Sequence, residues 1–281
     1  MSFLDRIAEC NVHDPAAYRT LTCAGHAVGA VRHRLAERLR DFPNVFAVTA
    51  ETVHLSDAFK DADQRSQAVE RVVRVLEADG IVRGRRDEAY PVLTSWGAEP
   101  LFRIERAAAP HFGIRSYGVH MTGYVRTPDG PQIWVARRAK TKPTYPGMLD
   151  NTVAGGQPVG LGLHDNMVKE CWEEAGIPAE LARKAVCVGA ITYRMDAEDG
   201  LKPDVQFCFD LELPADFVPR NTDGEIDEFF RWSWQKTAEV VAGTREFKFN
   251  CNLVLIDFFV RHGLVDPGRA DYLDIVAGMR R

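Results

Sequence analysis

The sequence GGQPVGLGLHDNMVKECWEEAGI, residues 155–177, places a pair of glycines, a loop and a short helix in succession. Residues 165–175 carry apolar and acidic side chains at helical spacing, and Gly176 follows directly. A glycine just beyond the last helical residue is typical of a helix C-terminus. Asp165 stands where an N-cap is expected, one turn before Lys169, with which it would pair. The segment therefore predicts a helix over residues 165–175.

Three glutamates, Glu170, Glu173 and Glu174, share one face of this helix, because residues three and four apart are neighbours. Their charges repel one another unless a cation lies among them. Carboxylate oxygens suit Mg²⁺ or Mn²⁺, ions that also hold substrate phosphates. The alternative is a solvated acidic surface. The opposite face is expected to pack on a sheet through Val168, Cys171, Trp172 and Ala175.

The same segment resembles the Nudix box, G-x5-E-x7-R-E-U-x-E-E-x-G-U with U apolar, in one ungapped frame. Gly155 aligns with the first glycine, and residues 169–177, KECWEEAGI, align with the end of the pattern. Two positions depart from the pattern, since Leu161 replaces the first glutamate and Lys169 replaces the arginine. The resemblance implies an α/β/α sandwich around a mixed sheet. The missing glutamate predicts reduced or altered metal binding rather than none.

Further stretches resemble one Nudix subfamily that has an extra N-terminal domain. They are YPVLTSWGAEPLFRIERAAA (90–109), GIRSYGVHMTGYV (113–125), TYPGMLDNTVAGG (144–156) and FKFNCNLVLIDFFVRHG (247–263). The subfamily includes the Nudix part of fungal thiamine pyrophosphokinase proteins. The resemblance implies hydrolysis of a small-molecule diphosphate, with oxo- or oxy-damaged thiamine diphosphates as substrates. The alternatives are an ADP-ribose or nucleotide-sugar pyrophosphatase, and a non-catalytic ligand sensor.

The resemblance also implies roles for the residues of the box. Glu173 and Glu174 would be the main ligands of Mg²⁺ or Mn²⁺, and Glu170 would complete the site or orient the attacking water. Gly155 and Gly156 would let other groups approach the backbone closely, although a plain turn also explains them.

Several residues outside the box are candidates for substrate contacts. Tyr145 and Trp232 are the leading aromatic residues for stacking on a heterocycle, with core packing as the alternative. The other candidates are the aromatic Tyr117 and Trp234, the basic Arg103, Arg106 and Lys142, and the acidic Glu225, Asp227 and Glu228. The acidic group would supply a base or an extra metal ligand, or else form a solvated loop. His120 is expected to be a structural strand residue.

Periodicity divides the chain into a smaller α+β domain, residues 1–113, and a Nudix domain, residues 114–281. In the first domain the clearest helix covers residues 63–79, and shorter helices are expected at 14–18 and 31–40. In the second, a long apolar helix covers residues 250–262. Its predicted strands are residues 118–126, 132–137, 151–154, 186–193, 205–213 and 228–234.

The composition is that of a globular protein, with 46% hydrophobic and 27% charged residues in a chain of 281. The net charge of −5 and the lack of a dense basic run predict no nucleic-acid partner. The apolar stretch 253–260 is too short to span a bilayer, so no membrane association is expected. No signal peptide is predicted, and the six cysteines form no C-x-x-C pair. A cytoplasmic location with reduced thiols is therefore expected.

Overall fold

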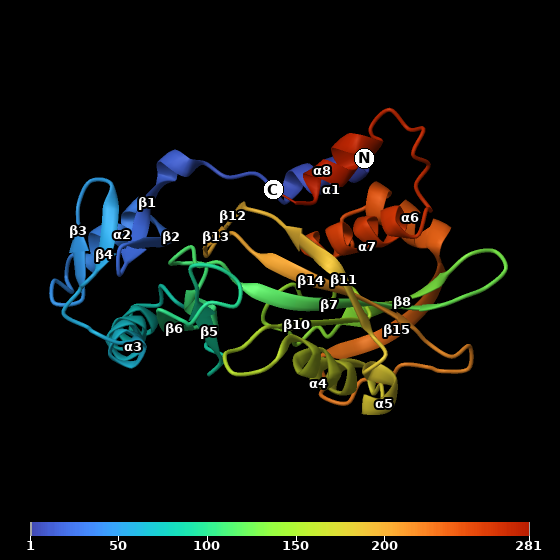
Figure 1. Ribbon diagram of the computed structural model, residues 1–281, viewed down its shortest axis with the longest axis horizontal. Coiled ribbons are helices and arrows are strands. Elements are labelled where there is room, and N and C mark those ends of the chain that lie inside the picture. The colour runs from blue at the N-terminus through green and yellow to red at the C-terminus, as the bar shows by residue number, and fades with distance from the viewer. Residues whose placement is uncertain (1, 281) are drawn as a thin grey trace.

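The computed structural model describes residues 2–280, and its first part is a small α+β module (Figure 1). Strands β1 to β4 form one sheet in the order β2-β1-β4-β3, and β1 and β4 are parallel. Strands β5 and β6 form a separate hairpin. The elements are β1 (Tyr18–Cys23), β2 (His26–Arg32), α2 (His33–Leu39), β3 (Phe46–Val48), β4 (Thr52–Leu55), α3 (Ala62–Ala78), β5 (Ala89–Val92) and β6 (Phe102–Glu105).

A hydrophobic core of its own holds this module together. Helix α3 buries Val69, Val72, Val73 and Leu76, the apolar stripe that its sequence predicted. The residues of this core extend from Leu21 to Ile114, and the last of them lies close to the predicted boundary. Residues 14–18 differ from the prediction, because Pro15–Ala17 forms only a single 3₁₀ turn capped by Asp14.

The N-terminal helix α1 (Phe3–Glu9) packs elsewhere, against α7 and α8. Phe3 and Ile7 are buried in the core of the second part, and the Phe3 ring stacks on Phe259 at 6.0 Å. The chain therefore begins and ends on the same side of the large sheet. A division into residues 1–113 and 114–281 remains a proposal, and α1 packs with the second of these units.

The second part is built on a mixed seven-stranded sheet. Its main order is β11-β14-β7-β8-β15, with β14 parallel to β7 and the other neighbours antiparallel. Strand β10 pairs with the first half of β7, and β9 pairs with β8. The strands are β7 (Tyr117–Val125), β8 (Gln132–Arg138), β9 (Leu149–Asp150), β10 (Val153–Gly156), β11 (Val186–Thr192), β14 (Val205–Glu212) and β15 (Ile226–Ser233). A short hairpin, β12 (Met195–Ala197) and β13 (Gly200–Lys202), joins β11 to β14.

Helices cover both faces of this sheet (Figure 1). One layer contains α6 (Trp234–Gly243), α7 (Phe249–Arg261), α8 (Tyr272–Gly278) and α1. The other layer contains α4 (Leu163–Ala175) and α5 (Ala179–Ala182). Alternation along β7 serves both layers, because Val119 and Met121 face α4 while Tyr124 packs with α7. The predicted α/β/α sandwich with an N-terminal module is confirmed.

The box helix differs in detail from its prediction. Helix α4 begins at Leu163 with Gly162 as its N-cap, so Asp165 lies in the first turn rather than at the cap. Trp172 is 56% exposed, and its predicted packing on the sheet is wrong. The helix instead buries Met167, Cys171, Glu174 and Ala175, a stripe at i, i+4, i+7 and i+8. Trp172 falls outside this stripe, and the carboxylate of Glu174 falls inside it.

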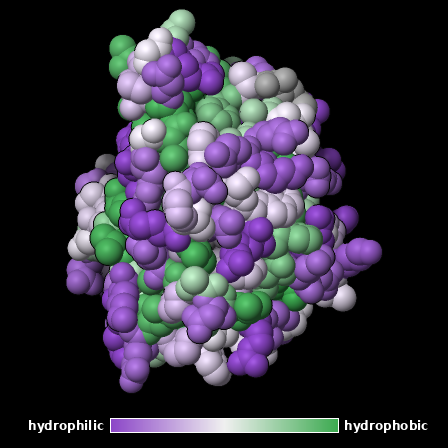
Figure 2. All heavy atoms as spheres, turned by 90° about the vertical axis from the view of Figure 1, so that its right-hand side faces the viewer, coloured by the Kyte–Doolittle hydropathy of each residue, from purple (hydrophilic) through white to green (hydrophobic). Residues whose placement is uncertain are grey.

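Hydrophobic residues lie in separate patches between hydrophilic ones on the face shown in Figure 2. Within residues 2–280, no helix has the length and apolar character needed to cross a bilayer. All six cysteines are free thiols, and five of them are buried.

Candidate active site

A cavity of about 640 Å³ lies between the N-terminal module and the large sheet. The module contributes Arg86, Tyr90 and Arg106 to its lining. The second part contributes the glycines Gly155 and Gly156, the carboxylates Glu170 and Glu173, and the side chains of Tyr145, Tyr193, Asp204, Gln206 and Asn250. The N-terminal module and the second part of the chain therefore line the same cavity.

Gly155 brings the box helix against the sheet edge. A methyl group at Gly155 would overlap the Glu170 side chain, so only glycine permits this packing. The Glu170 side chain is only 14% exposed, and burial raises the pKa of its carboxyl, although the Lys169 ammonium opposes the shift. The close approach expected at this glycine is therefore that of the Glu170 side chain.

Glu174 follows Glu170 by one helical turn, is almost fully buried and is not among the residues that line the cavity. Its Oε2 accepts a hydrogen bond of 2.7 Å from the backbone N–H of Ala154 in β10. Burial raises the pKa of Glu174 to about 8, and the neighbouring charge of Asp150 adds to the rise. Such a carboxylate is costly to keep charged without a cation nearby.

Glu173 is the most exposed of the three and also lines the cavity. The Lys169 Nζ lies 2.6 Å from its Oε2 and 3.1 Å from Oε1 of Glu170. The predicted pair between Asp165 and Lys169 is replaced by these contacts, because Lys169 turns toward the two glutamates. Lys169 thus compensates the charge of two box carboxylates.

This donor set fits a hard divalent cation. All three side chains offer carboxylate oxygens, and besides burial the charge of Glu170 raises the pKa of Glu174 while that of Glu173 raises the pKa of Glu170. The fit rests on this repulsion in a largely buried site, which Lys169 offsets in part and a cation among the oxygens would relieve further. Glu170, Glu173 and Glu174 would hold the ion.

A second acidic group reaches the same cavity in part. Glu225 and Asp223 line it, and the Glu225 carboxylate forms an ion pair with Lys142 that holds its pKa below its usual range against the opposing effect of burial. Asp227 accepts a hydrogen bond from the backbone of Lys140, and it does not belong to the cavity lining. Of the predicted acidic trio, only Glu225 is placed at the site.

Tyr145 and Trp232 have different environments. Tyr145 lines the cavity with a φ of 52°, a left-handed conformation that is unusual for a non-glycine residue. Arg138 holds this turn through hydrogen bonds to the carbonyls of Thr144 and Tyr145, at 2.8 and 3.0 Å. Trp232 instead stacks on Phe230 at 5.4 Å and packs against the α6–α7 core, so it does not contribute to this cavity. Its apolar neighbours explain why core packing prevails there.

Of the remaining predicted candidates, some line the cavity and others lie outside it. Arg106, Lys142 and Tyr117 line the cavity, whereas Arg103 pairs with Asp63 on α3, outside the lining. Trp234 begins α6 and lies over Gly130 of the β7–β8 turn.

Gly156 docks the N-terminal module onto the sheet. A methyl group at Gly156 would overlap the hydroxyl of Tyr90 and would lie 3.2 Å from the Arg106 guanidinium carbon. Arg106 in turn lies over the Tyr90 ring at 5.5 Å and donates a hydrogen bond of 2.6 Å to Glu88. The two box glycines therefore serve opposite neighbours, Glu170 on α4 and Tyr90 on the module.

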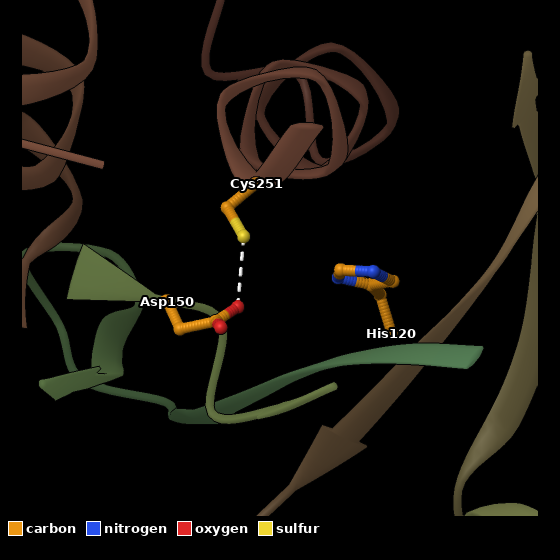
Figure 3. A group of neighbouring side chains, drawn as sticks. All are labelled: His120, Asp150 and Cys251. Atoms are coloured by element: carbon orange, nitrogen blue, oxygen red, sulfur yellow. Dashed lines mark hydrogen bonds between the residues drawn. The ribbon is translucent and has the colours of Figure 1, made fainter. Parts of the chain in front are cut away.

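A buried group of three possible ligands lies next to the cavity (Figure 3). Single donor atoms of His120, Asp150 and Cys251 lie within 4.8 Å of one another. The Asp150 carboxylate already pairs with Arg138 at 2.7 Å and accepts from the Cys251 thiol at 2.8 Å. Burial raises the pKa of that thiol well above its usual value, which keeps it protonated. The donors are thus committed to a hydrogen-bond network, and the set does not fit a cation.

His120 is a structural residue, as expected for a strand histidine with a partner. It is buried, its Nδ1 lies 2.7 Å from Oδ1 of Asn151, and burial lowers its pKa to about 4. The ring is therefore neutral at pH 7. Its Nε2 faces the Asn250 amide at 3.4 Å, beside the cavity wall.

Sequence reasoning missed four polar residues of that wall. The Tyr193 hydroxyl donates to Oδ2 of Asp204 at 2.9 Å and accepts from Gln206 and Asn250 at 3.2 and 3.4 Å. Tyr193, Gln206 and Asn250 are buried. For Gln206 in β14 and Asn250 in α7, a polar residue inside an otherwise apolar element was the available signal, since such residues need partners when buried.

Comparison with known proteins shows which proteins this chain is similar to. A family model described as a domain of unknown function (DUF4743) matches residues 2–116. Nudix hydrolase 20, chloroplastic, of Arabidopsis thaliana is 41% identical over 289 residues, covering 99% of this chain and 77% of the relative. The chain belongs to the Nudix hydrolase family. Nudix hydrolase 24, chloroplastic, of the same plant is 40% identical and is covered to the same extent, 99% and 77%. A Saccharomyces cerevisiae protein of uncharacterized function is 33% identical over 85% of this chain and 75% of its own length.

Membership of the Nudix hydrolases makes this protein an enzyme that acts on phosphorus-containing anhydrides. The family assignment from the box is confirmed, despite Leu161 and Lys169. Both plant relatives carry the word chloroplastic in their names, and a cytoplasmic location for this chain stays a prediction.

Proposed function

We propose that this Nudix hydrolase cleaves the terminal diphosphate of a thiamine-diphosphate-like substrate, in its oxo- or oxy-damaged form, to the monophosphate and phosphate. Mg²⁺ or Mn²⁺ would be the cofactor. One observation carries the proposal: a single cavity is lined both by box carboxylates and by aromatic and polar side chains. The diphosphate would lie at the carboxylates of Glu170 and Glu173, and the heterocycle would lie against the aromatic and polar side chains.

The bound cation would neutralise the diphosphate and acidify a water molecule. Glu173 and Glu174 would hold it, and Glu170 would orient that water for attack on the terminal phosphorus. A new bond from the water oxygen to phosphorus would form as the bridging P–O bond breaks. The proton lost by the water would pass to a carboxylate, with Glu170 and Glu225 as the groups at the site that can accept it.

Cationic side chains would hold the phosphate oxygens. Arg86, Arg106 and Lys142 line the cavity, and each offers N–H donors to an anion. Their partners, Glu88 for Arg106 and Glu225 for Lys142, keep them in place before substrate binds. Positioning and charge stabilisation are the main contributions a protein makes to phosphoryl transfer.

Tyr145 would stack on the heterocycle. A non-glycine residue held in a left-handed turn stores strain, and such strain is found most often at functional sites. Gly155 and Gly156 would act indirectly, by seating Glu170 and Tyr90 beside the phosphates.

Enclosure on both sides favours a terminal diphosphate over ADP-ribose. The module closes the space over Gly156 with Tyr90 and Arg106, whereas ADP-ribose carries organic groups on both sides of its diphosphate. A non-catalytic sensor would bind the same molecules without turnover.

Side-by-side initial rates test the proposal. Purified full-length enzyme with Mg²⁺ or Mn²⁺ would receive oxythiamine diphosphate, thiamine diphosphate or ADP-ribose at equal concentrations. We expect a higher kcat/KM for oxythiamine diphosphate than for ADP-ribose, with phosphate as a product. A tenfold preference for ADP-ribose, about 1.4 kcal/mol of discrimination, would replace this proposal with the nucleotide-sugar alternative. Binding of all three without turnover would indicate the sensor.

A further inference from the structure

We propose that Asp204 is the specificity-determining residue of this cavity, and that it selects ligands whose heterocycle presents a ring N–H. The proposal rests on the proposed function, because it uses the same cavity, and it adds the feature of the organic group that is recognised. A ring with an N–H beside a carbonyl, as in a pyrimidone, is the chemical class that fits.

The position of Asp204 comes from a turn between two strands. It lies between β13 and β14, directly before Val205, which pairs with Tyr117 at the start of β7. Its side chain lines the cavity, and burial raises its pKa to about 6. Tyr193, directly after the adjoining β11, donates its hydroxyl to the same carboxylate.

The hydrogen bonds of the wall run in one direction. Gln206 and Asn250 donate their amide N–H groups to the Tyr193 hydroxyl, and that hydroxyl donates to Asp204. Every donor in this series of hydrogen bonds therefore points toward Asp204, which is the last acceptor of the series. A carboxylate has about four lone-pair sites, and the Tyr193 hydroxyl and the backbone N–H of Ser116 use two of them. The capacity that remains at the cavity is acceptor capacity.

His120 lies beside this hydrogen-bond chain, and its own acceptor nitrogen is already in use. Oδ1 of Asn151 can only accept, so Nδ1 of the neutral ring donates to it, and the Asn250 amide donates to the unprotonated Nε2. Asp204 is thus the acceptor that this part of the wall leaves for a ligand. The wall therefore favours a ligand edge rich in N–H groups over an edge made only of acceptors. Burial strengthens this preference, since an acceptor placed against a buried carboxylate is repelled and loses its water.

Aromatic rings define where a planar ligand would lie. Phe249 meets the rings of Tyr145 and Tyr193 edge-on, with centroids 5.5 Å apart in both cases. The Phe249 ring therefore lies between Tyr145 and Tyr193, whose hydroxyl donates to Asp204. A flat heterocycle on Tyr145 would present its edge to the polar wall, while Lys202, 5.9 Å from the Tyr145 ring, supplies a positive charge nearby.

A role for Asp204 as a mere anchor of Tyr193 makes a different prediction. Asparagine keeps an acceptor oxygen for the Tyr193 hydroxyl but replaces the other oxygen with a donor. An anchor would therefore tolerate Asp204→Asn, whereas an N–H reader would not. Asp196 provides a matched control, because it also accepts from a tyrosine hydroxyl, that of Tyr18, and does not line the cavity.

The experiment measures binding without chemistry. Isothermal titration calorimetry of the metal-free full-length protein would use oxythiamine, which carries a pyrimidone N–H and no phosphate, and its N-methylated analogue. We expect the wild-type protein and Asp196→Asn to bind oxythiamine at least tenfold more tightly than the methylated compound. Asp204→Asn should lose most of that preference while keeping the wild-type melting temperature to within a few degrees.

Equal binding of the two compounds by the wild-type protein would overturn the proposal, and this arm needs no variant to fold. An unchanged preference in Asp204→Asn would also overturn it. Failure of the proposed function is a separate result, since it would show as absent turnover of oxythiamine diphosphate with metal while the N–H preference in calorimetry persisted.

Discussion

Glu174 is the residue at which burial and catalysis conflict most clearly. Burial raises its pKa to about 8, so its charge is costly in the folded protein without a cation. Glu174→Gln removes that cost and keeps an oxygen for the Ala154 N–H. We expect a melting temperature that is unchanged or higher without metal, and activity lower by about two orders of magnitude or more.

A thermal melt and a phosphate-release assay on the same sample check this pair of effects. Glu180→Gln, on the exposed surface of α5, is the control and should change neither quantity. Full activity in Glu174→Gln would remove it from the catalytic set.

Asp204 makes stability depend on pH in a defined direction. Its pKa rises from about 4 in the unfolded chain to about 6 in the folded protein, since burial outweighs the attraction of Lys202 and Lys248. The folded state then holds the proton more tightly between pH 4 and 6. Stability from this group is present below about pH 4 and is lost as pH rises through 6, by at most about 3 kcal/mol.

Asp204→Asn should therefore gain stability relative to the wild type on going from pH 4 to pH 7.5. Urea unfolding at the two pH values measures the difference. An identical difference in unfolding free energy at both values would contradict the assigned shift.

Helical spacing in the sequence was enough to single out the three box glutamates as candidates, whereas Tyr193 and Asp204 of the cavity wall could not be found in this way. Glu170, Glu173 and Glu174 are recognisable because helical spacing alone places them on one face. Asp204 and Tyr193 were not recognisable, because they meet only when β11 and β14 pair in the sheet. Trp232 was a candidate for substrate stacking, but it packs against the helical core. The sequence does not reveal which layer an aromatic strand residue faces until the register with β8 is known.

Strand β10 is the element that organises the site. Its alternation turns Gly155 toward Glu170 and Gly156 toward Tyr90, so two consecutive residues seat the box helix and the N-terminal module. The glycine pair was predictable from sequence, although it was expected to end the strand rather than belong to it. The start of α4 and the side chains that it buries were predicted less well, because the sequence of the preceding loop does not show which residue is the first of the helix.

Gly156→Ala tests that arrangement. The new methyl group would overlap the Tyr90 hydroxyl, and we expect a loss of about 1–3 kcal/mol of stability. Chemical denaturation measures it, and adding Tyr90→Phe should restore part of the loss. Gly243→Ala, in an open helical position on α6, should be neutral or slightly stabilising. A neutral Gly156→Ala would mean that Tyr90 does not dock there.

At the scale of the whole molecule, the N-terminal module is part of the active site. Its own core runs from Leu21 to Ile114, and its Arg86, Tyr90 and Arg106 reach the shared cavity. The sequence predicted a separate module because periodicity is local, and for the same reason it could not reveal that α1 packs with α7 and α8 across more than two hundred residues.

Arg106→Ala should weaken substrate binding if the module holds phosphate. We expect KM for the diphosphate to rise about tenfold with a smaller change in kcat, since a bidentate guanidinium contact would be lost. Arg103→Ala is the control, because Arg103 pairs with Asp63 outside the cavity. Steady-state kinetics compare the two, and equal effects of both substitutions would contradict a specific role for Arg106.

The central claim is that cation-assisted cleavage of a diphosphate occurs at the box carboxylates. The most direct measurement is phosphate release from oxythiamine diphosphate by the wild-type protein and Glu173→Gln, each with Mg²⁺, with Mn²⁺ and with chelator. The account predicts turnover by the wild-type protein only with a metal, and a rate at least about a hundredfold lower for a folded Glu173→Gln. Metal-independent release, or equal rates in the two proteins, would contradict it.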